Sequence, residues 1–301
     1  MDKIHTPVLL QESLDSLNIQ PDGFYIDCTL GDGGHSIEIL KRLSREGLLL
    51  SLDHDQHAID FVKEYYKEEL EKNDNWIIEK GNFKNIKELT KEISTKPLGI
   101  LMDIGLSSRQ LEESHQRGFS YNEEDEPLDM RMDESLGVTA LDLLKALPEK
   151  KLADLFWRYG EERYSKPIAR EIKNNISDIK TVGDLTRLVY KVVPVNSNKN
   201  PSRRVFQALR IVVNDELTNL EIGLNNSFEI LQEGGRISVI SFHSLEDRIV
   251  KNYFLEKQGS GEGEMLFKSQ IAPTDDEKKH NPRSASAKLR TLIKTRKSKL
   301  Y

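Results

Sequence analysis

The sequence predicts an α/β fold in which a helical domain is inserted between two strands of one parallel sheet. Strand and helix patterns alternate over the first hundred residues, and strand patterns then stop until residue 234. Such alternation is typical of βαβ units, whose helices cover both faces of the sheet. Because a crossover normally needs about a dozen residues, we interpret so long an interruption as an insertion. We therefore assign residues 1–105 and 231–301 to a discontinuous domain and residues 106–230 to an inserted helical domain.

Each element follows from its own residues. Apolar and β-branched residues predict strands at 24–30, 48–55, 76–83 and 98–105, and helical spacing predicts helices at 36–43, 58–70 and 85–93. In the insertion, helical patterns cover 139–147, 150–176, 181–193 and 202–231. The sheet pattern returns at 234–244, followed by a helix at 245–257 and short candidate strands at 265–270 and 289–295.

Composition sets the broad class of the protein. Hydrophobic residues make up 37% and charged residues 31% of the 301, which predicts a packed core under a well-solvated surface. No apolar run approaches the roughly 18 residues of a membrane span, and no signal peptide is recognisable, so we expect a cytosolic protein with no membrane partner. Cys28 is the single cysteine, which excludes an internal disulfide and a cysteine-rich zinc site, and we expect no metal.

Basic residues are concentrated in two segments, although the net charge is −6. Residues 278–301 carry nine Lys or Arg and residues 199–210 carry four, with no acid in either segment. This distribution favours a polyanionic partner. We expect phosphate contacts from Arg203 and Arg210, which share one helical stripe, and from Lys288 and Arg290 near the C-terminus.

A glycine-rich loop after the first strand predicts a nucleotide-like ligand. It reads Gly31-Asp32-Gly33-Gly34-His35-Ser36, without the third glycine of a dinucleotide fingerprint. Asp53 ends the second strand twenty positions after Gly33, where a carboxylate can bind both hydroxyls of an adenosine ribose. NAD and S-adenosylmethionine share that requirement. Asp27 and Asp32 would repel a pyrophosphate and are compatible with a sulfonium, so we favour S-adenosylmethionine; a tight turn without a ligand is the plain alternative.

Acidic side chains stand at or near the ends of three predicted strands. Asp27, Asp53 and Asp103 lie at or near the ends of the first, second and fourth strands, and the carboxyl ends of parallel strands meet at one crevice. His243 ends the strand before the last long helix, so we expect it to contact the base or the cofactor. Ser244 is expected to cap that helix, with Asp247 three residues further on.

Several long motifs resemble one enzyme family. They are "HTPVLL" (5–10), "DCTLGDGGHS" (27–36), "LDHD" (52–55), "GNF" (81–83), "DIGLSSRQLEESHQRGFSY" (103–121), "PLDMRMD" (127–133), "YGEERYSKPIAR" (159–170), "RVFQALRIVVNDEL" (204–217), "GGRISVISFHSLEDRIVK" (234–251) and "NPRSASAKLR" (281–290). With them the chain resembles the bacterial small-subunit (16S) ribosomal RNA cytosine-N4 methyltransferases over nearly its whole length. The resemblance implies a Rossmann-like S-adenosylmethionine-dependent methyltransferase sheet, interrupted by a substrate-recognition domain.

The resemblance also implies site residues and a substrate. The residues that match the family's cofactor site are Gly33, Gly34, His35, Asp53, Phe83, Asp103 and Gln110, with Phe83 near the adenine. The implied substrate is a cytidine of small-subunit ribosomal RNA, expected within an assembled or assembling subunit. The sequence leaves free RNA open as the substrate, and it leaves the oligomeric state open, a homodimer included. The chain departs from the family at Glu126, where glycine is usual, and at Ala285, where arginine is usual.

Candidate chemical roles follow for a few residues. Asp103 is the first candidate either to accept from the cytosine amine or to anchor the cofactor. Phe119 and Tyr121 could stack on the base or be plain core aromatics. Methylation at cytosine C5 needs a cysteine nucleophile, and Cys28 lies inside a strand, which speaks against that chemistry. A methyltransferase of another amine, a nicotinamide dehydrogenase and a catalytically silent RNA-binding protein stay as alternatives.

Overall fold

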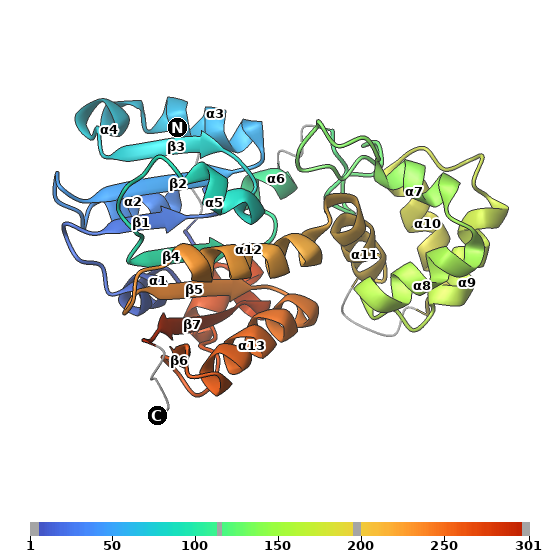
Figure 1. Cartoon of the computed structure of the whole chain (residues 1–301). Helices are drawn as coiled ribbons and strands as arrows, with labels where there is room; N and C mark the ends of the chain where they lie inside the picture. The colour runs from blue at the N-terminus through green and yellow to red at the C-terminus, as the bar shows by residue number, and fades with distance from the viewer. Residues whose placement is uncertain (1–5, 113–115, 195–199, 297–301) are drawn as a thin grey trace. The chain divides into compact units, whose positions relative to one another are not determined.

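The computed structural model describes residues 6–112, 116–194 and 200–296, and it divides the chain into two compact units (Figure 1). Unit 1 comprises Met1–Gly105 and Leu217–Tyr301, and unit 2 comprises Leu106–Glu216. Within the described ranges, no helix is both long enough and apolar enough to span a membrane.

Unit 1 is built on a seven-stranded sheet with the order β3-β2-β1-β4-β5-β7-β6. Its strands are β1 (Phe24–Asp27), β2 (Leu48–Asp53), β3 (Trp76–Lys80), β4 (Gly99–Asp103), β5 (Arg236–Ser241), β6 (Gly263–Met265) and β7 (Lys288–Lys294). The first five strands pair in parallel, whereas β7 is antiparallel to both β5 and β6. The sheet confirms the predicted Rossmann-like α/β class.

Alternating residues of the buried strands supply two separate cores. Ile26, Leu50 and Met102 face one core with α5 (Ile86–Leu89), α12 (Glu216–Ile230) and α13 (Ser244–Gly259). Their neighbours Tyr25, Leu49 and Leu101 face the other, with α1 (Leu10–Leu17), α2 (Gly34–Leu40) and α3 (Gln56–Tyr65). A period of two along fully buried strands is what a sheet covered on both faces requires.

Four smaller elements complete unit 1. They are α4 (Lys67–Lys72), the 3-10 turn η1 (Phe83–Asn85), α14 (Asp275–His280) and the 3-10 turn η2 (Pro282–Ser286). The thiol of Cys28 is buried among the residues of the α12 core, and burial raises its pKa. Cys28 follows the end of β1 and is a small residue of this core.

Helix α12 corrects the expected domain boundary. The sequence pattern extends the predicted insertion to residue 230, but unit 1 already resumes at Leu217. The reason is packing, because Leu220, Leu224 and Phe228 are buried in the core of unit 1. The single helix expected over 202–231 is also two helices, since Asp215 adopts a left-handed conformation with φ of 49°.

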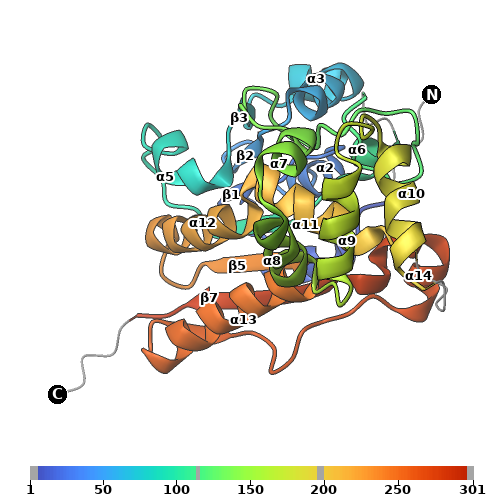
Figure 2. The same cartoon turned by 90° about the vertical axis from the view of Figure 1, so that its right-hand side faces the viewer.

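Over the described residues, the helices of unit 2 are joined by loops and turns. They are α6 (Ser108–Glu112), α7 (Ala140–Ala146), α8 (Glu149–Gly160), α9 (Ser165–Asn174), α10 (Val182–Val192) and α11 (Arg203–Asn214), and a long loop precedes α7. Thr139 with Asp142 and Thr181 with Asp184 form capping boxes that fix the starts of α7 and α10. Helix α8 packs against α9 and α11, and Figure 2 views these helices from another side.

Candidate active site

The glycine loop between β1 and α2 is shaped by contacts within the chain. Gly33 has a φ of +80°, and a Cβ there would lie 2.9 Å from Cε2 of Tyr66. A Cβ on Gly34 would lie 2.3 Å from Cγ of Pro7. The segment around Pro7 therefore lies against the start of α2. Packing within the chain favours glycine at both positions, whether or not a ligand binds.

Asp53 ties the end of β2 to the glycine loop. Its Oδ2 accepts a hydrogen bond from the Gly31 N–H at 2.9 Å, and its Oδ1 accepts from the Asp55 N–H at 2.9 Å. A carboxylate has about four acceptor positions, so each oxygen keeps capacity for one ribose hydroxyl. Burial raises the pKa of Asp53, while nearby His54 and the two backbone donors oppose that shift.

Asp27 lies beneath the loop and not in the crevice, which corrects our expectation. It is fully buried and accepts from Ser36 Oγ at 2.6 Å and from the Thr29 N–H at 3.1 Å. Ser36 Oγ lies 2.8 Å from Ser51 Oγ, which in turn accepts from Trp76 Nε1 at 2.9 Å. Burial, only partly offset by these donors, raises the pKa of Asp27 to about 7. Its charge therefore gives little support to the sulfonium argument.

Asp103 and His35 lie together at the carboxyl end of β4. The Thr29 hydroxyl accepts from the Asp103 N–H at 2.7 Å, and Asp103 Oδ2 lies 3.6 Å from His35 Nδ1. Asp103 Oδ1 is buried with no hydrogen-bond partner among the described residues. Since 23% of the side chain is exposed, a ligand can reach this carboxyl group. Burial, with repulsion from Asp27 and Glu246, raises the pKa of Asp103 well above its usual value.

His35 is a buried neutral imidazole. Its side chain is 5% exposed, and its Nε2 lies 3.2 Å from the Val8 carbonyl oxygen. Burial lowers its pKa to about 4. With Nε2 protonated and donating to Val8, the Nδ1 lone pair faces Asp103.

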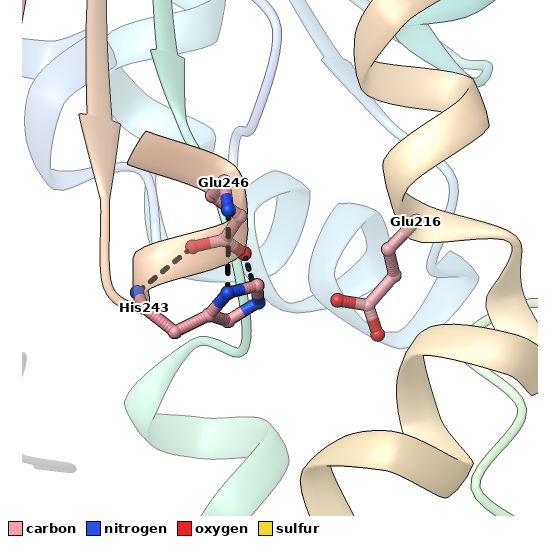
Figure 3. A group of neighbouring side chains, drawn as sticks. All are labelled: Glu216, His243 and Glu246. Carbon is pink, nitrogen blue, oxygen red and sulfur yellow. Dashed lines mark hydrogen bonds and ion pairs between the residues drawn. The ribbon is translucent and has the colours of Figure 1, made fainter. Parts of the chain in front are cut away.

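His243 caps α13, which corrects the expected cap by one residue. Its Nδ1 accepts from the Glu246 N–H at 3.3 Å, while Glu246 Oε2 accepts from the His243 N–H at 3.1 Å (Figure 3). Glu246 Oε2 also accepts from the Phe242 N–H at 2.9 Å. The capping box is thus His243 with Glu246, in place of Ser244 with Asp247. Glu246 is fully buried and His243 only 8% exposed, so the imidazole is largely committed to this cap.

Asp247 instead forms ion pairs with two cations of β7, the last strand of the chain. Its Oδ2 accepts from Lys288 Nζ at 3.0 Å and its Oδ1 from Arg290 Nε at 2.7 Å. The Arg290 side chain is 10% exposed and that of Lys288 35%. Both cations therefore have an internal partner, and their expected phosphate contacts stay a prediction.

The last two residues of the expected cofactor site lie in different surroundings. Phe83 follows β3 and is 8% exposed, and its ring fills the space that a Cβ on Gly223 of α12 would need. Gln110 belongs to unit 2, where its Oε1 accepts from the Ser107 N–H at 2.9 Å. The structure thus brings Gly33, Gly34, His35, Asp53 and Asp103 to one edge of the sheet, with Phe83 in the adjoining core.

In unit 2, Arg203 and Arg210 differ in their surroundings. Arg203 is exposed, but Arg210 donates from Nε and Nη2 to Glu216 at 2.8 and 2.9 Å. The Arg210 side chain is 17% exposed and is held in this bidentate pair, so its expected phosphate contact stays a prediction. Glu216, which Figure 3 also draws, is the last residue of unit 2.

The acidic loop of unit 2 has its own internal supports. Phe119 is 5% exposed, and Tyr121 meets Phe206 edge-on with ring centroids 6.1 Å apart, which favours plain core aromatics over base stacking. Glu126, which departs from the family pattern, accepts from the Gly118 N–H at 2.9 Å. Glu126 thereby fixes a left-handed glycine whose added Cβ would lie 2.2 Å from the Pro127 carbonyl oxygen.

Sequence reasoning missed the residues that support the loop from below. Thr29, Ser36 and Ser51 form the hydrogen bonds around Asp27, and Pro7 covers Gly34. Small polar residues inside apolar strand patterns were the available signal, because a buried hydroxyl needs a partner. Glu246 was detectable too, since it stands three residues after His243 at the start of a helix.

Comparison with known proteins identifies the family. A family model described as the MraW methylase family matches residues 2–295. A ribosomal RNA small subunit methyltransferase H from Fusobacterium nucleatum subsp. nucleatum is 44% identical, covering 97% of this chain and 98% of the relative. A protein of the same name from Clostridium botulinum (strain Loch Maree / Type A3) is 42% identical, covering 98% and 100%. The chain therefore belongs to the MraW methylase family.

Proposed function

We propose that this chain transfers a methyl group from S-adenosylmethionine to the exocyclic N4 of a specific cytidine in small-subunit (16S) ribosomal RNA. We base this proposal chiefly on the position of the Asp103 carboxyl group. It stands beside the glycine loop at a strand end, with one oxygen buried and without a partner among the described residues. Such an acceptor suits the N–H donors of a donor amine or a cytosine amine. Membership of the methylase family supports the reaction type.

The residues around the loop fit the methyl donor. Asp53 would accept from its ribose hydroxyls, the loop from Gly31 to His35 would lie against it, and Phe83 would border its adenine. When bound, the donor supplies an electrophilic methyl on a sulfonium. Its positive charge matches a crevice edge that presents the carboxyl groups of Asp53 and Asp103.

Catalysis rests mainly on positioning. The cytosine amine is a weak nucleophile because its lone pair is delocalised into the ring, so the enzyme must orient the N–H groups and turn the lone pair toward the methyl. Asp103 is placed to accept from that amine or from the donor, and its partly exposed carboxyl group can serve either role. The His35 imidazole lies against Asp103 and helps to position it. His243 stays a candidate contact for the base.

The proposed substrate is the RNA within an assembled or assembling small subunit in the cytoplasm. Names of the relatives support small-subunit RNA. Of the four cations expected to contact phosphate, only Arg203 is without a partner among the described residues, while Arg210, Lys288 and Arg290 have internal partners. A homodimer stays a prediction, which analytical ultracentrifugation tests.

The deciding experiment measures transfer of labelled methyl to small subunits that lack the modification, followed by digestion of the RNA and identification of the nucleoside. Label in N4-methylcytidine is the expected result. Label in another nucleoside would keep the fold and overturn the chemistry. Tight donor binding without transfer to subunits or to free RNA would reject the proposed substrate.

A further inference from the structure

Unit 2 carries exposed aromatic and basic side chains where α8 ends and α11 begins. We call the set the α8–α11 patch, and it consists of Trp157, Arg158, Arg163, Tyr164, Arg203 and Arg204. Trp157 is 59% exposed and Tyr164 40% exposed. An indole left in water forgoes the stabilisation of burial, so such exposure marks a candidate interaction surface.

Backbone contacts join the two parts of the patch. A Cβ on Gly160 of α8 would lie 2.5 Å from the carbonyl oxygen of Arg204, so the two helices touch there. The amide of Gln207 also donates to the Tyr159 carbonyl at 3.1 Å. Trp157 precedes Gly160 by three residues, close to one helical turn, so both residues lie on the same side of α8. Trp157 and the start of α11 thus flank the same crossing point.

The turn after α8 is held in a defined conformation. Glu161 adopts a left-handed conformation that ends the helix, and buried Glu162 accepts from the Tyr164 N–H at 2.8 Å. Arg163 and Tyr164 are therefore presented by a fixed backbone.

The arginines of unit 2 separate into two groups. Unit 2 contains ten arginines. Four form ion pairs with acids, namely Arg131 with Asp129, Arg170 with Glu149, Arg187 with Asp184 and Arg210 with Glu216. Arg109 and Arg117 also have partners. The remaining four, Arg158, Arg163, Arg203 and Arg204, have none among the described residues, and all four belong to the patch.

Charge and exposure together identify the kind of partner. Within residues 157–164 and 203–204, the exposed charges are four arginines and one acid, Glu161. Guanidinium groups free of internal acids bind phosphates, and exposed aromatic rings stack on unpaired bases. We propose that the α8–α11 patch binds a single-stranded segment of RNA, with Trp157 stacked on a base. This inference rests on the proposed function and names the surface by which unit 2 recognises the substrate.

Trp157 provides a direct probe. The chain has two tryptophans, and Trp76 is 4% exposed, so acrylamide quenching of the fluorescence reports chiefly on Trp157. A single-stranded RNA oligonucleotide should protect Trp157 from acrylamide, and a duplex of equal length should protect it much less. Trp157→Phe should retain part of the affinity, whereas Trp157→Ala should weaken single-strand binding about tenfold.

The arginines are tested through salt dependence. Replacing Arg203 and Arg204 together by alanine should lower the slope of log affinity against log salt by about 0.7 for each phosphate that the two side chains bind. Arg170→Ala with Arg187→Ala is the matched control, because both residues are exposed but paired with acids. Tyr190→Ala is the aromatic control, since Tyr190 is 40% exposed on α10.

The outcomes separate this inference from the proposed function. If the wild type methylates small subunits while the patch variants bind and methylate equally well, the surface is rejected and the function stands. If the patch binds RNA but no methyl reaches ribosomal RNA, the function is rejected and the surface stands. Protection of Trp157 that grows with protein concentration in the absence of RNA would identify a second copy as the partner and overturn the inference.

Discussion

His35 Nδ1 lies 3.6 Å from Asp103 Oδ2, and burial opposes the charge on both partners. Burial lowers the pKa of His35 to about 4 and raises that of Asp103 well above its usual value. The contact is therefore a poor ion pair. A bound cationic ligand would stabilise the ionised form of Asp103. It would therefore oppose the effect of burial on the pKa of this side chain.

Replacing Asp103 by asparagine should lower the rate of methyl transfer by about 10²–10³-fold, because the variant lacks one preorganised acceptor at the reacting edge. Single-turnover transfer and calorimetric donor binding should be measured together. Loss of rate with unchanged donor affinity would assign Asp103 to the cytosine amine, and loss of both would assign it to the donor. An Asp103→Asn enzyme with full activity would contradict any direct role; Asp154→Asn, an exposed site on α8, is the control.

Donor affinity should rise with pH through the range in which Asp103 ionises. The pKa of Asp103 is raised in the free protein, so its neutral form predominates at low pH and a cationic ligand must displace that proton. Calorimetry over a series of pH values should show the trend in the wild type and a weaker trend in Asp103→Asn, because Asp53 keeps its own raised pKa. S-adenosylhomocysteine keeps the amine and lacks the sulfonium. A pH trend that persists with this ligand would assign the contact of Asp103 to the amine, and a trend that disappears would assign it to the sulfonium. A flat profile for both ligands in the wild type speaks against this linkage.

Asp27 should make the protein less stable as the pH rises. Its pKa is about 7 in the folded protein against 3.8 when unfolded, so the folded state binds the extra proton between these values. Stability is greatest below the unfolded pKa and is lost as the pH rises through about 7. His35 has the opposite effect between about pH 4 and pH 6.5. Its pKa is lowered in the folded protein, so the stability that it contributes is lost on acidification. The two effects mask each other in the wild type.

The variant Asp27→Asn separates them. Between pH 5 and pH 8, the difference in unfolding free energy between wild type and variant should change by about 3 kcal/mol in favour of the variant. Urea unfolding at the two pH values measures it. The same difference at both pH values would mean that Asp27 keeps an ordinary pKa.

Gly34→Ala should destabilise unit 1 by about 1–3 kcal/mol and weaken donor binding. The added methyl would lie 2.3 Å from Cγ of Pro7, so the covering segment or the loop must move. Gly137→Ala is the matched control, because nothing lies within 4 Å of its Cβ position. Thermal unfolding and donor titration give both readouts; equal behaviour of the two variants would remove Pro7 as a constraint.

Asp247→Ala should cost about 3 kcal/mol of stability, since it leaves Lys288 and the largely buried Arg290 without their shared acid. Denaturant unfolding measures this change. Arg290→Ala should likewise lower stability while leaving the salt dependence of RNA binding unchanged. A reduced salt slope with unaltered stability would restore Arg290 as a phosphate contact.

The sequence predicted the sheet well because buried parallel strands leave a strong local signal. "YIDCTL", "LLLSLD" and "ILMDIG" are apolar runs that contain an acid, and their strands end at Asp27, Asp53 and Asp103. Strand ends are set by where backbone pairing stops, and this edge also gathers most of the candidate site.

Contacts between distant segments could not be predicted in the same way. The burial of Asp27 depends on Ser36, Ser51 and Trp76, which come from three other elements. The helical position of Arg210 predicts a surface cation, but the structure pairs it with Glu216. This acid lies within reach because Asp215 turns the chain between α11 and α12. Periodicity reports which face of a helix is polar, and it does not report which acid that face meets.

The buried thiol of Cys28 makes the chain convenient for site-specific labelling. It is the single cysteine, 2% exposed, and burial raises its pKa, so little reactive thiolate is available to a maleimide or an oxidant. A cysteine introduced at an exposed position, such as Tyr190 in unit 2 or Tyr65 in unit 1, would be the preferred attachment point for a dye. Paired labels on the two units would then report by energy transfer how each responds to donor and to RNA, without removal of any native residue in the core.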